Sequence, residues 1–187
     1  MDYKRRMIPL ASNYLPIDFA PTPWAGRLGM SACPGARPGG GNTDGALVQD
    51  VAAIAQQGVR VVVSLLDTLE LQRLGAKNLS HHLGLHGIVW HQLPVVDYGV
   101  PSRAVTVQWR RLVPQLTSQL QSGNILIHCA HGEGRTGTLA ATLFKAWGWS
   151  SDAAIARIRQ YRLGAIETHK QEAYIEAFEL QPDEAGD

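Results

Sequence analysis

Cysteine is scarce in this sequence: Cys33 and Cys129 are the two cysteines among 187 residues. Two cysteines cannot build the dense disulfide framework that holds many small secreted proteins together. A free, reactive thiol survives best in a reducing compartment. We therefore expect a cytoplasmic protein whose cysteines are not paired for structural reasons.

An excess of charge of one sign is also missing. The chain has 17 Lys and Arg against 16 Asp and Glu, a formal net charge of +1. Without a broad basic field it is not a general binder of nucleic acid or of membrane surfaces. No apolar run approaches membrane-spanning length, and the N-terminus lacks the pattern of a signal peptide. We therefore predict no nucleic-acid partner and no membrane partner, and we expect a monomer.

The composition that remains is ordinary for a globular protein, with 45% hydrophobic and 18% charged residues. The length fits one domain with a substantial core. Prolines at 9, 16, 21 and 23 indicate an extended N-terminal arm over residues 1–23. We assign residues 24–180 to the domain and residues 181–187 to a C-terminal tail.

Hydrophobic patterning predicts strands that alternate with helices, followed by helices alone. The run 59–66 is apolar on both faces, which is typical of an interior strand of a mostly parallel sheet. Expected strands are 27–32, 59–66, 88–93 and 125–127. Expected helices begin at Asn42 or Thr43, at Asp67 or Thr68 and at Pro101, and cover 136–147, 151–161 and 167–180; Pro114 is expected to kink or split its helix, and 75–87 is expected to be irregular. This order predicts a three-layer α/β domain with a central, mostly parallel sheet flanked by helices.

The stretch His128-Cys129-Ala130-His131-Gly132-Glu133-Gly134-Arg135-Thr136-Gly137 lies between the strand 125–127 and a helix. Its glycines let the loop curl so that successive backbone N–H groups converge on one point. The following helix directs its partial positive end to the same point. Such a cup binds a tetrahedral dianion and stabilises a thiolate at its base.

Cys129 is therefore the candidate nucleophile, although a lone cysteine after a strand is commonly inert core. Arg135 offers a planar fork of donors for two phosphate oxygens; the alternative is a surface arginine paired with an acid. Thr136 can donate its hydroxyl to the Cys129 sulfur, cap the helix, or do both. His128 is expected to fix the loop, as a satisfied, packed histidine.

A phosphate ester also needs a proton donor for its leaving oxygen and a base for the attacking water. Asp97 is the candidate for both tasks, because it lies on a Gly/Pro-bounded loop after a strand. Asp67 also follows a strand and is the fallback. The competing interpretation for either residue is a turn cap.

The residues expected to surround the phosphate are those of the loop: Ala130, His131, Gly132, Glu133, Gly134 and Arg135. Glu133 is unusual, because a carboxylate in an anion-binding loop repels highly phosphorylated ligands. We predict that it faces away from the anion and pairs with Arg157 or Arg159. For Cys33 two interpretations stay open, a buried core cysteine or a reversible disulfide with oxidised Cys129.

The pattern His128-Cys129-x5-Arg135-Thr136 resembles the signature of the cysteine-dependent protein tyrosine phosphatase superfamily. The stretches 28–35, 70–71, 93–101 and 159–168 are similar to the cyclin-dependent-kinase-associated phosphatase subgroup of its compact dual-specificity branch. The resemblance covers about residues 24–178. It implies the fold of that family, a cysteinyl-phosphate intermediate, no metal and no cofactor. It also implies that Asp97 acts as acid and then base, and that Gln171 lies near the hydrolytic water; the alternative for Gln171 is a solvated side chain on a terminal helix.

We therefore expect a phosphatase for a phosphorylated protein, acting on phosphotyrosine, with phosphoserine and phosphothreonine as further candidates. The alternative is a phosphatase for a phosphoinositide or another non-protein phosphate ester. It ranks lower because the loop lacks the lysines of lipid-directed relatives. Sulfur transfer, arsenate reduction and phosphate binding without turnover are further alternatives.

Overall fold

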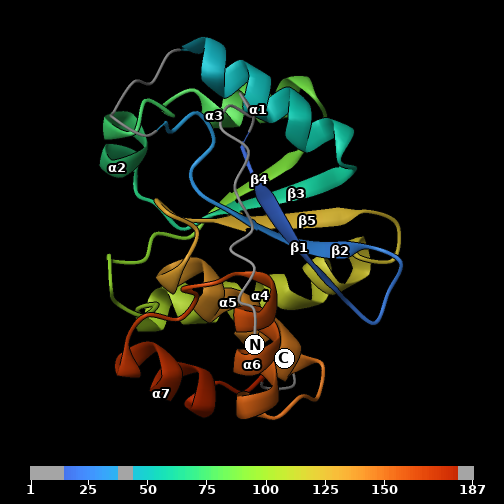
Figure 1. The fold of residues 1–187 in the computed structure, drawn as a ribbon, viewed down its shortest axis with the longest axis vertical. Helices are drawn as coiled ribbons and strands as arrows, with labels where there is room; N and C mark the ends of the chain where they lie inside the picture. The colour runs from blue at the N-terminus through green and yellow to red at the C-terminus, as the bar shows by residue number, and fades with distance from the viewer. Residues whose placement is uncertain (1–14, 38–43, 181–187) are drawn as a thin grey trace, which may run out of the picture.

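The computed structural model describes residues 15–37 and 44–180, which form a central sheet with helices on both faces (Figure 1). The sheet has five strands in the order β1-β2-β5-β3-β4. Four of them are parallel, and β1 joins the edge antiparallel to β2. The strands are β1 (Ile17–Pro21), β2 (Arg27–Ser31), β3 (Val59–Ser64), β4 (Val89–Gln92) and β5 (Asn124–His128). The prediction of a mostly parallel central sheet is confirmed.

The helices form two layers, one on each face of this sheet (Figure 1). One layer contains α1 (Asp44–Gln56) and α3 (Leu79–Leu85), with α2 (Thr68–Arg73) beside it. The other contains α4 (Arg103–Gln119) and α5 (Gly134–Ala146), with α6 (Ser151–Tyr161) and α7 (His169–Ala177) packed on α5. The three-layer arrangement is thus as expected from the alternation of strands and helices.

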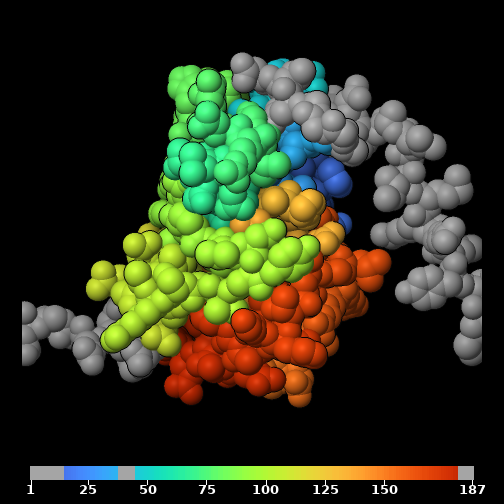
Figure 2. Space-filling view, turned by 90° about the vertical axis from the view of Figure 1, so that its left-hand side faces the viewer, coloured from blue at the N-terminus to red at the C-terminus, as the bar shows by residue number. Residues whose placement is uncertain are grey.

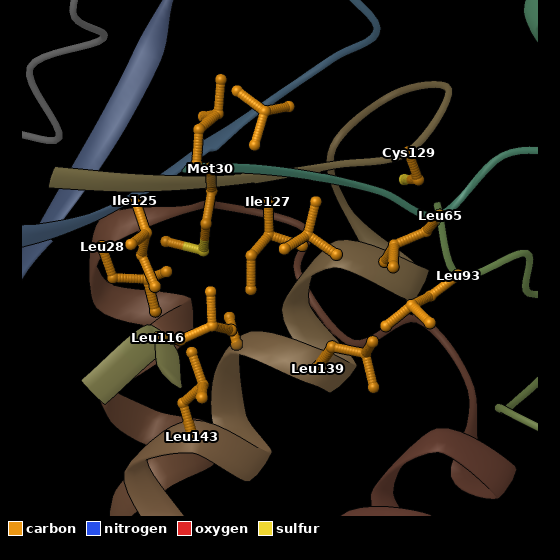
Figure 3. Close-up of a cluster of buried hydrophobic side chains, with 14 of the residues drawn as sticks. Leu28, Met30, Leu65, Leu93, Leu116, Ile125, Ile127, Cys129, Leu139 and Leu143 are labelled. Atoms are coloured by element: carbon orange, nitrogen blue, oxygen red, sulfur yellow. The ribbon is translucent and has the colours of Figure 1, made fainter. Parts of the chain in front are cut away.

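Burial on both faces explains the composition of the central strands. Val61, Val62 and Val63 of β3 are all buried, although neighbouring side chains in a strand point to opposite faces. Figure 3 shows one of the two cores, where Ile125 and Ile127 of β5 lie above leucines of the helix layer below. The sheet is therefore held from both sides, and the ends of its parallel strands are fixed in space.

Several local predictions differ from the structure. The predicted arm contains β1, a strand of the sheet; Pro16 precedes it and Pro21 is its last residue, which an edge strand tolerates. The region predicted to be irregular contains α3, whose Leu79 and Leu83 are buried four residues apart on one face. Residues 1–14, 181–187 and the predicted cap at 42–43 lie outside the described residues.

The helix predicted to begin at Pro101 begins later, because Ser102 is its N-cap and accepts the N–H of Val105. Pro114 lies inside this helix, and the helix is not split there. Within 15–37 and 44–180, no helix combines the length and the apolar character needed to cross a membrane.

Candidate active site

The loop after β5 lies at the carboxyl end of the central parallel strands. Cys129 directly follows the last residue of β5 and is almost fully buried beneath the loop (Figure 3). The backbone N–H of Gly132 donates a hydrogen bond to Cys129 Sγ, with 3.2 Å between N and Sγ. Gly132 has φ +78°, and a Cβ there would collide with the backbone carbonyl of Ser31. Glycine is therefore required for the loop to close over the sulfur, as the sequence predicts.

The outward side of the loop is held by Arg162, a residue that the sequence did not single out. Its Nη2 donates to the carbonyl of His131 at 2.6 Å, and its Nε donates to the carbonyl of Gly132 at 3.1 Å. Its Nη1 binds Asp18 of β1 at 2.8 Å. Because Arg162 holds these loop carbonyls on one side, the N–H groups of the same peptides are directed to the other side, where the sulfur lies.

Arg135 lies in the first turn of α5 and is 2% exposed. Its Nη1 donates to Glu70 Oε1 at 2.8 Å and to the Val95 carbonyl at 3.0 Å, and its Nη2 lies 3.2 Å from Asp97 Oδ1. Burial opposes its charge, but the hydrogen bond with Glu70 and the nearby negative charges outweigh burial, so the pKa of Arg135 is raised. The buried Nε has no hydrogen-bond partner among the described residues. One donor of the fork is therefore available for an anion.

Thr136 does not cap the helix, so that alternative is wrong. The helix begins at Gly134 with Glu133 at the N-cap position, two residues earlier than predicted. The hydroxyl of Thr136 is buried and has no hydrogen-bond partner within the part of the chain that the structure describes. Like Arg135 Nε, it is a polar group that the folded protein leaves available.

His128 is fixed by a chain of hydrogen bonds beneath the loop. The Trp90 Nε1–H donates to Ser64 Oγ at 2.7 Å, and Ser64 Oγ lies 2.6 Å from His128 Nε2. His128 Nδ1 lies 3.3 Å from the Cys129 carbonyl, which can only accept, so Nδ1 carries the proton and Ser64 donates to Nε2. Burial lowers the pKa of His128 to about 4, and the charge of Arg135 acts in the same direction. His128 is therefore a neutral, satisfied histidine, as the sequence suggested.

Asp97 and Asp67, the two candidate acids, have different surroundings. Asp97 lies between β4 and α4, is half-exposed, and accepts the N–H of Tyr98 at 3.1 Å besides contacting Arg135. Asp67 caps α2, accepting the N–H of Glu70 at 2.7 Å in a capping box. The turn-cap interpretation thus describes Asp67, and of the two aspartates Asp97 is the one that contacts Arg135.

Gln171 is buried, so its interpretation as a solvated side chain is wrong. Its Oε1 accepts the N–H groups of Glu167 and Thr168 at 2.8 and 3.2 Å. Its Nε2 donates to the carbonyl of Gly99 at 3.2 Å, which joins the start of α7 to the segment that carries Asp97. The same nitrogen lies close to Gly134, because a Cβ added to that glycine would be in tight contact with it. Gln171 thus lies beside the loop.

The predicted partners of Glu133 are wrong. Arg159 binds Glu172 at 2.7 Å and the carbonyls of Ala165 and Ile166, while Arg157 lies over the ring of Tyr161 at 4.8 Å. The carboxyl group of Glu133 lies against Gly164 instead. The sequence also did not point to Glu167, whose carboxylate lies directly over Gly134.

The remaining candidates are placed as follows. Ala130 accepts the N–H of Cys33 at 3.1 Å, and His131 is exposed. Both cysteines are free, and Cys33 is fully buried. Burial raises the pKa of Cys33 to about 12, with Cys129 and nearby carboxylates adding to the effect, so its thiol stays protonated.

No group of three or more His, Cys, Asp and Glu side chains that could hold a metal occurs in residues 15–37 and 44–180.

Comparison with known proteins adds to this geometry. The family model described as "Polymorphic toxin system, DSP-PTPase phosphatase" matches residues 38–148. The protein tyrosine phosphatase domain-containing protein 1 of Bos taurus is 37% identical over 86 residues. That match covers 46% of this chain and 10% of the relative, so the chain spans a small part of the curated proteins it matches.

The fold is also found among solved structures. Kinase associated phosphatase (KAP), crystallised with its catalytic-site cysteine replaced by serine, has a TM-score of 0.76 and 26% identity, covering 88% of this chain and 94% of that one. PTPMT1, solved in complex with PI(5)P, has a TM-score of 0.63 and 19% identity, covering 80% of this chain and 87% of that one.

Proposed function

Because this chain belongs to the DSP-PTPase phosphatase family of polymorphic toxin systems and has the compact dual-specificity phosphatase fold, we propose that it dephosphorylates a phosphorylated protein. The proposed substrate carries phosphotyrosine, with phosphoserine and phosphothreonine as further candidates, and the reaction passes through a cysteinyl phosphate on Cys129. One observation carries the proposal. Beside a buried thiol that accepts a loop amide, Arg135 Nε and Thr136 Oγ1 are buried polar groups without partners in the described chain.

In the first step the Cys129 thiolate attacks phosphorus, and an S–P bond forms as the bond to the ester oxygen breaks. The N–H groups of residues 130–135 and the Arg135 guanidinium carry the negative charge of the transferring group. Asp97 gives its proton to the leaving oxygen. Its half-exposed position next to Arg135 supports this role.

In the second step water attacks the phosphocysteine, and the S–P bond breaks as phosphate is released. Asp97, now a carboxylate, takes the proton of the attacking water. The Thr136 hydroxyl donates to the departing sulfur, which returns as a thiolate. Gln171 supports this step, because its contact with Gly99 holds the segment that carries Asp97 beside the loop. The guanidinium and amides carry the charge, so the proposed reaction includes neither metal nor cofactor.

The test uses a panel of phosphotyrosine, phosphoserine and phosphothreonine peptides with the wild type and three variants. Cys129→Ser is expected to abolish turnover, since the alcohol is a far weaker nucleophile at neutral pH. Asp97→Ala is expected to lower kcat by roughly 100-fold to 10,000-fold, the usual contribution of a general acid. Asp67→Ala is the matched control and is expected to change kcat little.

Turnover that survives Cys129→Ser would overturn the proposed mechanism. Full activity of Asp97→Ala would favour sulfur transfer or arsenate reduction, which do not need that acid. A comparison with a phosphoinositide tests the alternative substrate class, for which the loop offers little support, since it carries Glu133 and no lysine.

A further inference from the structure

Several large apolar side chains are exposed around the candidate active site. Leu69 is 62% exposed, Val96 80%, Tyr98 62% and Leu163 85%. Burying such side chains is favourable, so a surface that keeps them in water is a candidate contact surface. Whether they form one contact surface depends on where they lie relative to one another.

Each of these side chains is next in sequence to a residue that touches Arg135 or the loop. Leu69 precedes Glu70, which binds Arg135 Nη1, and Leu163 follows Arg162, which binds two loop carbonyls. Val96 and Tyr98 stand on either side of Asp97. Since consecutive Cα atoms are about 3.8 Å apart, all four side chains start close to the same opening.

The view of this side of the molecule agrees with that placement. In Figure 2 the orange surface around residue 130 lies between the green surface of the α2 region, the lime surface around residue 100 and the red surface of the last helices. Three separate chain segments thus border the loop, and each contributes at least one exposed apolar side chain. We call Leu69, Val96, Tyr98 and Leu163 the apolar rim.

Two carboxylates lie within the same border. Glu133 lies against Gly164, next to Leu163, and Glu167 lies over Gly134 in the loop itself. Neither carboxylate has an ion-pair partner in residues 15–37 and 44–180, whereas Glu70 and Asp97 are paired with Arg135. The border of the site is therefore apolar and negatively charged at once.

We propose that the apolar rim, together with Glu133 and Glu167, is a docking surface for a phosphorylated polypeptide segment. This proposal rests on the proposed function above. The segment carries apolar side chains, which cover the rim, and Lys or Arg side chains beside the phosphorylated residue, which face the two carboxylates. Charge complementarity and continuity with the site support this occupant. An anionic lipid surface would also cover apolar side chains, but the two carboxylates repel it.

The test compares four substrates by their kcat/KM. The first is a phosphotyrosine peptide with apolar and basic neighbours; the second has serine in place of the apolar residues, and the third has glutamate in place of the basic ones. The fourth is para-nitrophenyl phosphate, which is too small to reach the rim. For the wild type we expect the first peptide to exceed the second and the third by roughly tenfold each.

Two sets of variants separate the two contributions. Leu69→Ser combined with Leu163→Ser is expected to reduce the preference for apolar neighbours to about twofold or less, with little change for para-nitrophenyl phosphate. The matched control is Leu85→Ser combined with Val89→Ser. These side chains are 69% and 53% exposed, and Val89 begins β4 at the strand end opposite to Cys129. For Glu133→Gln combined with Glu167→Gln the ratio between the first and third peptides is expected to approach one.

The outcomes distinguish this proposal from the proposed function. Equal kcat/KM for the three peptides, with para-nitrophenyl phosphate still hydrolysed, would overturn the docking surface alone. A phosphoinositide in vesicles that is hydrolysed faster than every peptide, and that is slowed by the rim variants, would overturn it in favour of a lipid surface. Loss of the apolar preference in the rim variant and of the basic preference in the glutamate variant, with both preferences kept in the control variant, supports it.

Discussion

At the scale of single residues, two arginines have different roles at the loop after β5. Arg135 has a buried Nε without a hydrogen-bond partner among the described residues, whereas Arg162 uses three nitrogens to hold two loop carbonyls and Asp18. In the proposed reaction the first binds the phosphate, and the second is a positioning residue. A lysine cannot reproduce a planar fork of several donors, although it keeps the charge.

Arg162→Lys is therefore expected to lower kcat/KM by roughly tenfold to 100-fold, because the loop amides lose their fixed direction. The inhibition constant of vanadate, which reports on the anion cup alone, is expected to rise by a similar factor. Arg157→Lys is the control, because Arg157 lies in α6, which ends just before Arg162, and packs on Tyr161. A variant with an unchanged vanadate constant would show that Arg162 does not shape the cup.

His128 makes stability depend on pH. The pKa of His128 is lowered from 6.5 to about 4 in the folded state by burial, so the unfolded chain binds the extra proton more readily. Its contribution is fully present above pH 6.5 and is lost as the pH falls towards 4. By this linkage the wild type should lose roughly 2 to 3 kcal/mol of unfolding free energy between pH 7 and pH 4.5.

Urea unfolding at the two pH values measures this loss, and His128→Gln provides the comparison. The glutamine variant is less stable at pH 7, because Ser64 and the core are adapted to the imidazole. It is nevertheless expected to lose less stability than the wild type between the two pH values. Equal losses in both proteins would assign the pH dependence to other groups.

The sequence could predict those residues whose chemistry depends on spacing along the chain. Cys129 and Arg135 are placed by one strand, one loop and the first turn of one helix, so their pattern is local. Arg162 could not be found in this way, because it binds carbonyl groups, which every residue has. The partners of Glu133 were predicted wrongly for a related reason: Arg159 has an acid nearby in α7, Glu172, and that contact depends on how two helices pack.

At the scale of elements, the loop between β5 and α5 requires glycine at one position in particular. Gly132 and Gly148 both have positive φ, +78° and +90°, which costs an L-residue roughly 1 kcal/mol or more at either site. They differ in surroundings: a Cβ on Gly132 meets the Ser31 backbone, and a Cβ on Gly148 meets nothing within 4 Å. Alanine at the two positions therefore separates backbone strain from collision.

Gly148→Ala is expected to lower Tm by a few degrees and to leave kcat unchanged, because its turn lies outside the site. Gly132→Ala is expected to lower kcat/KM by at least roughly 100-fold, since the amide that contacts Cys129 Sγ must move. Steady-state kinetics and thermal unfolding of both variants check this. Equal kinetic effects would mean that positive φ alone matters.

Elements with strong periodicity were predictable, and those with mixed signals were not. The valines of β3 and the leucines of α4 gave clear patterns, whereas α3 has two histidines between its buried leucines, Leu79 and Leu83. β1 was missed because Pro16 precedes, and Pro21 ends, a strand of only five residues. Such a strand is stable because it pairs with β2. This pairing is not visible in the residues of the strand itself.

At the scale of the whole molecule, the edge of the sheet is connected to the loop of the candidate active site. Asp18 of β1 and Arg162 are 144 positions apart in the sequence, yet their side chains are 2.8 Å apart, and Arg162 holds the loop. A domain boundary at residue 23 would therefore remove a strand that the site uses. A boundary before residue 15 would keep the pairing of β1 with β2 and the contact between Asp18 and Arg162.

Two truncated chains and one point variant test this coupling. The chain 15–187 is expected to keep the kcat/KM of the full chain. The chain 24–187 is expected to lose roughly 10 °C or more in Tm, because β1 buries Ala20 and pairs along the whole of β2. Its kcat/KM, measured well below its Tm, is expected to fall as well, because Arg162 loses Asp18.

Asp18→Asn in the full chain separates the effect on stability from the effect on activity. This variant keeps β1, so its Tm is expected to stay that of the wild type. It weakens the contact with Arg162, so it should lower kcat/KM less than Arg162→Lys does. A chain 24–187 with unchanged activity would show that β1 stabilises the sheet without acting on the loop.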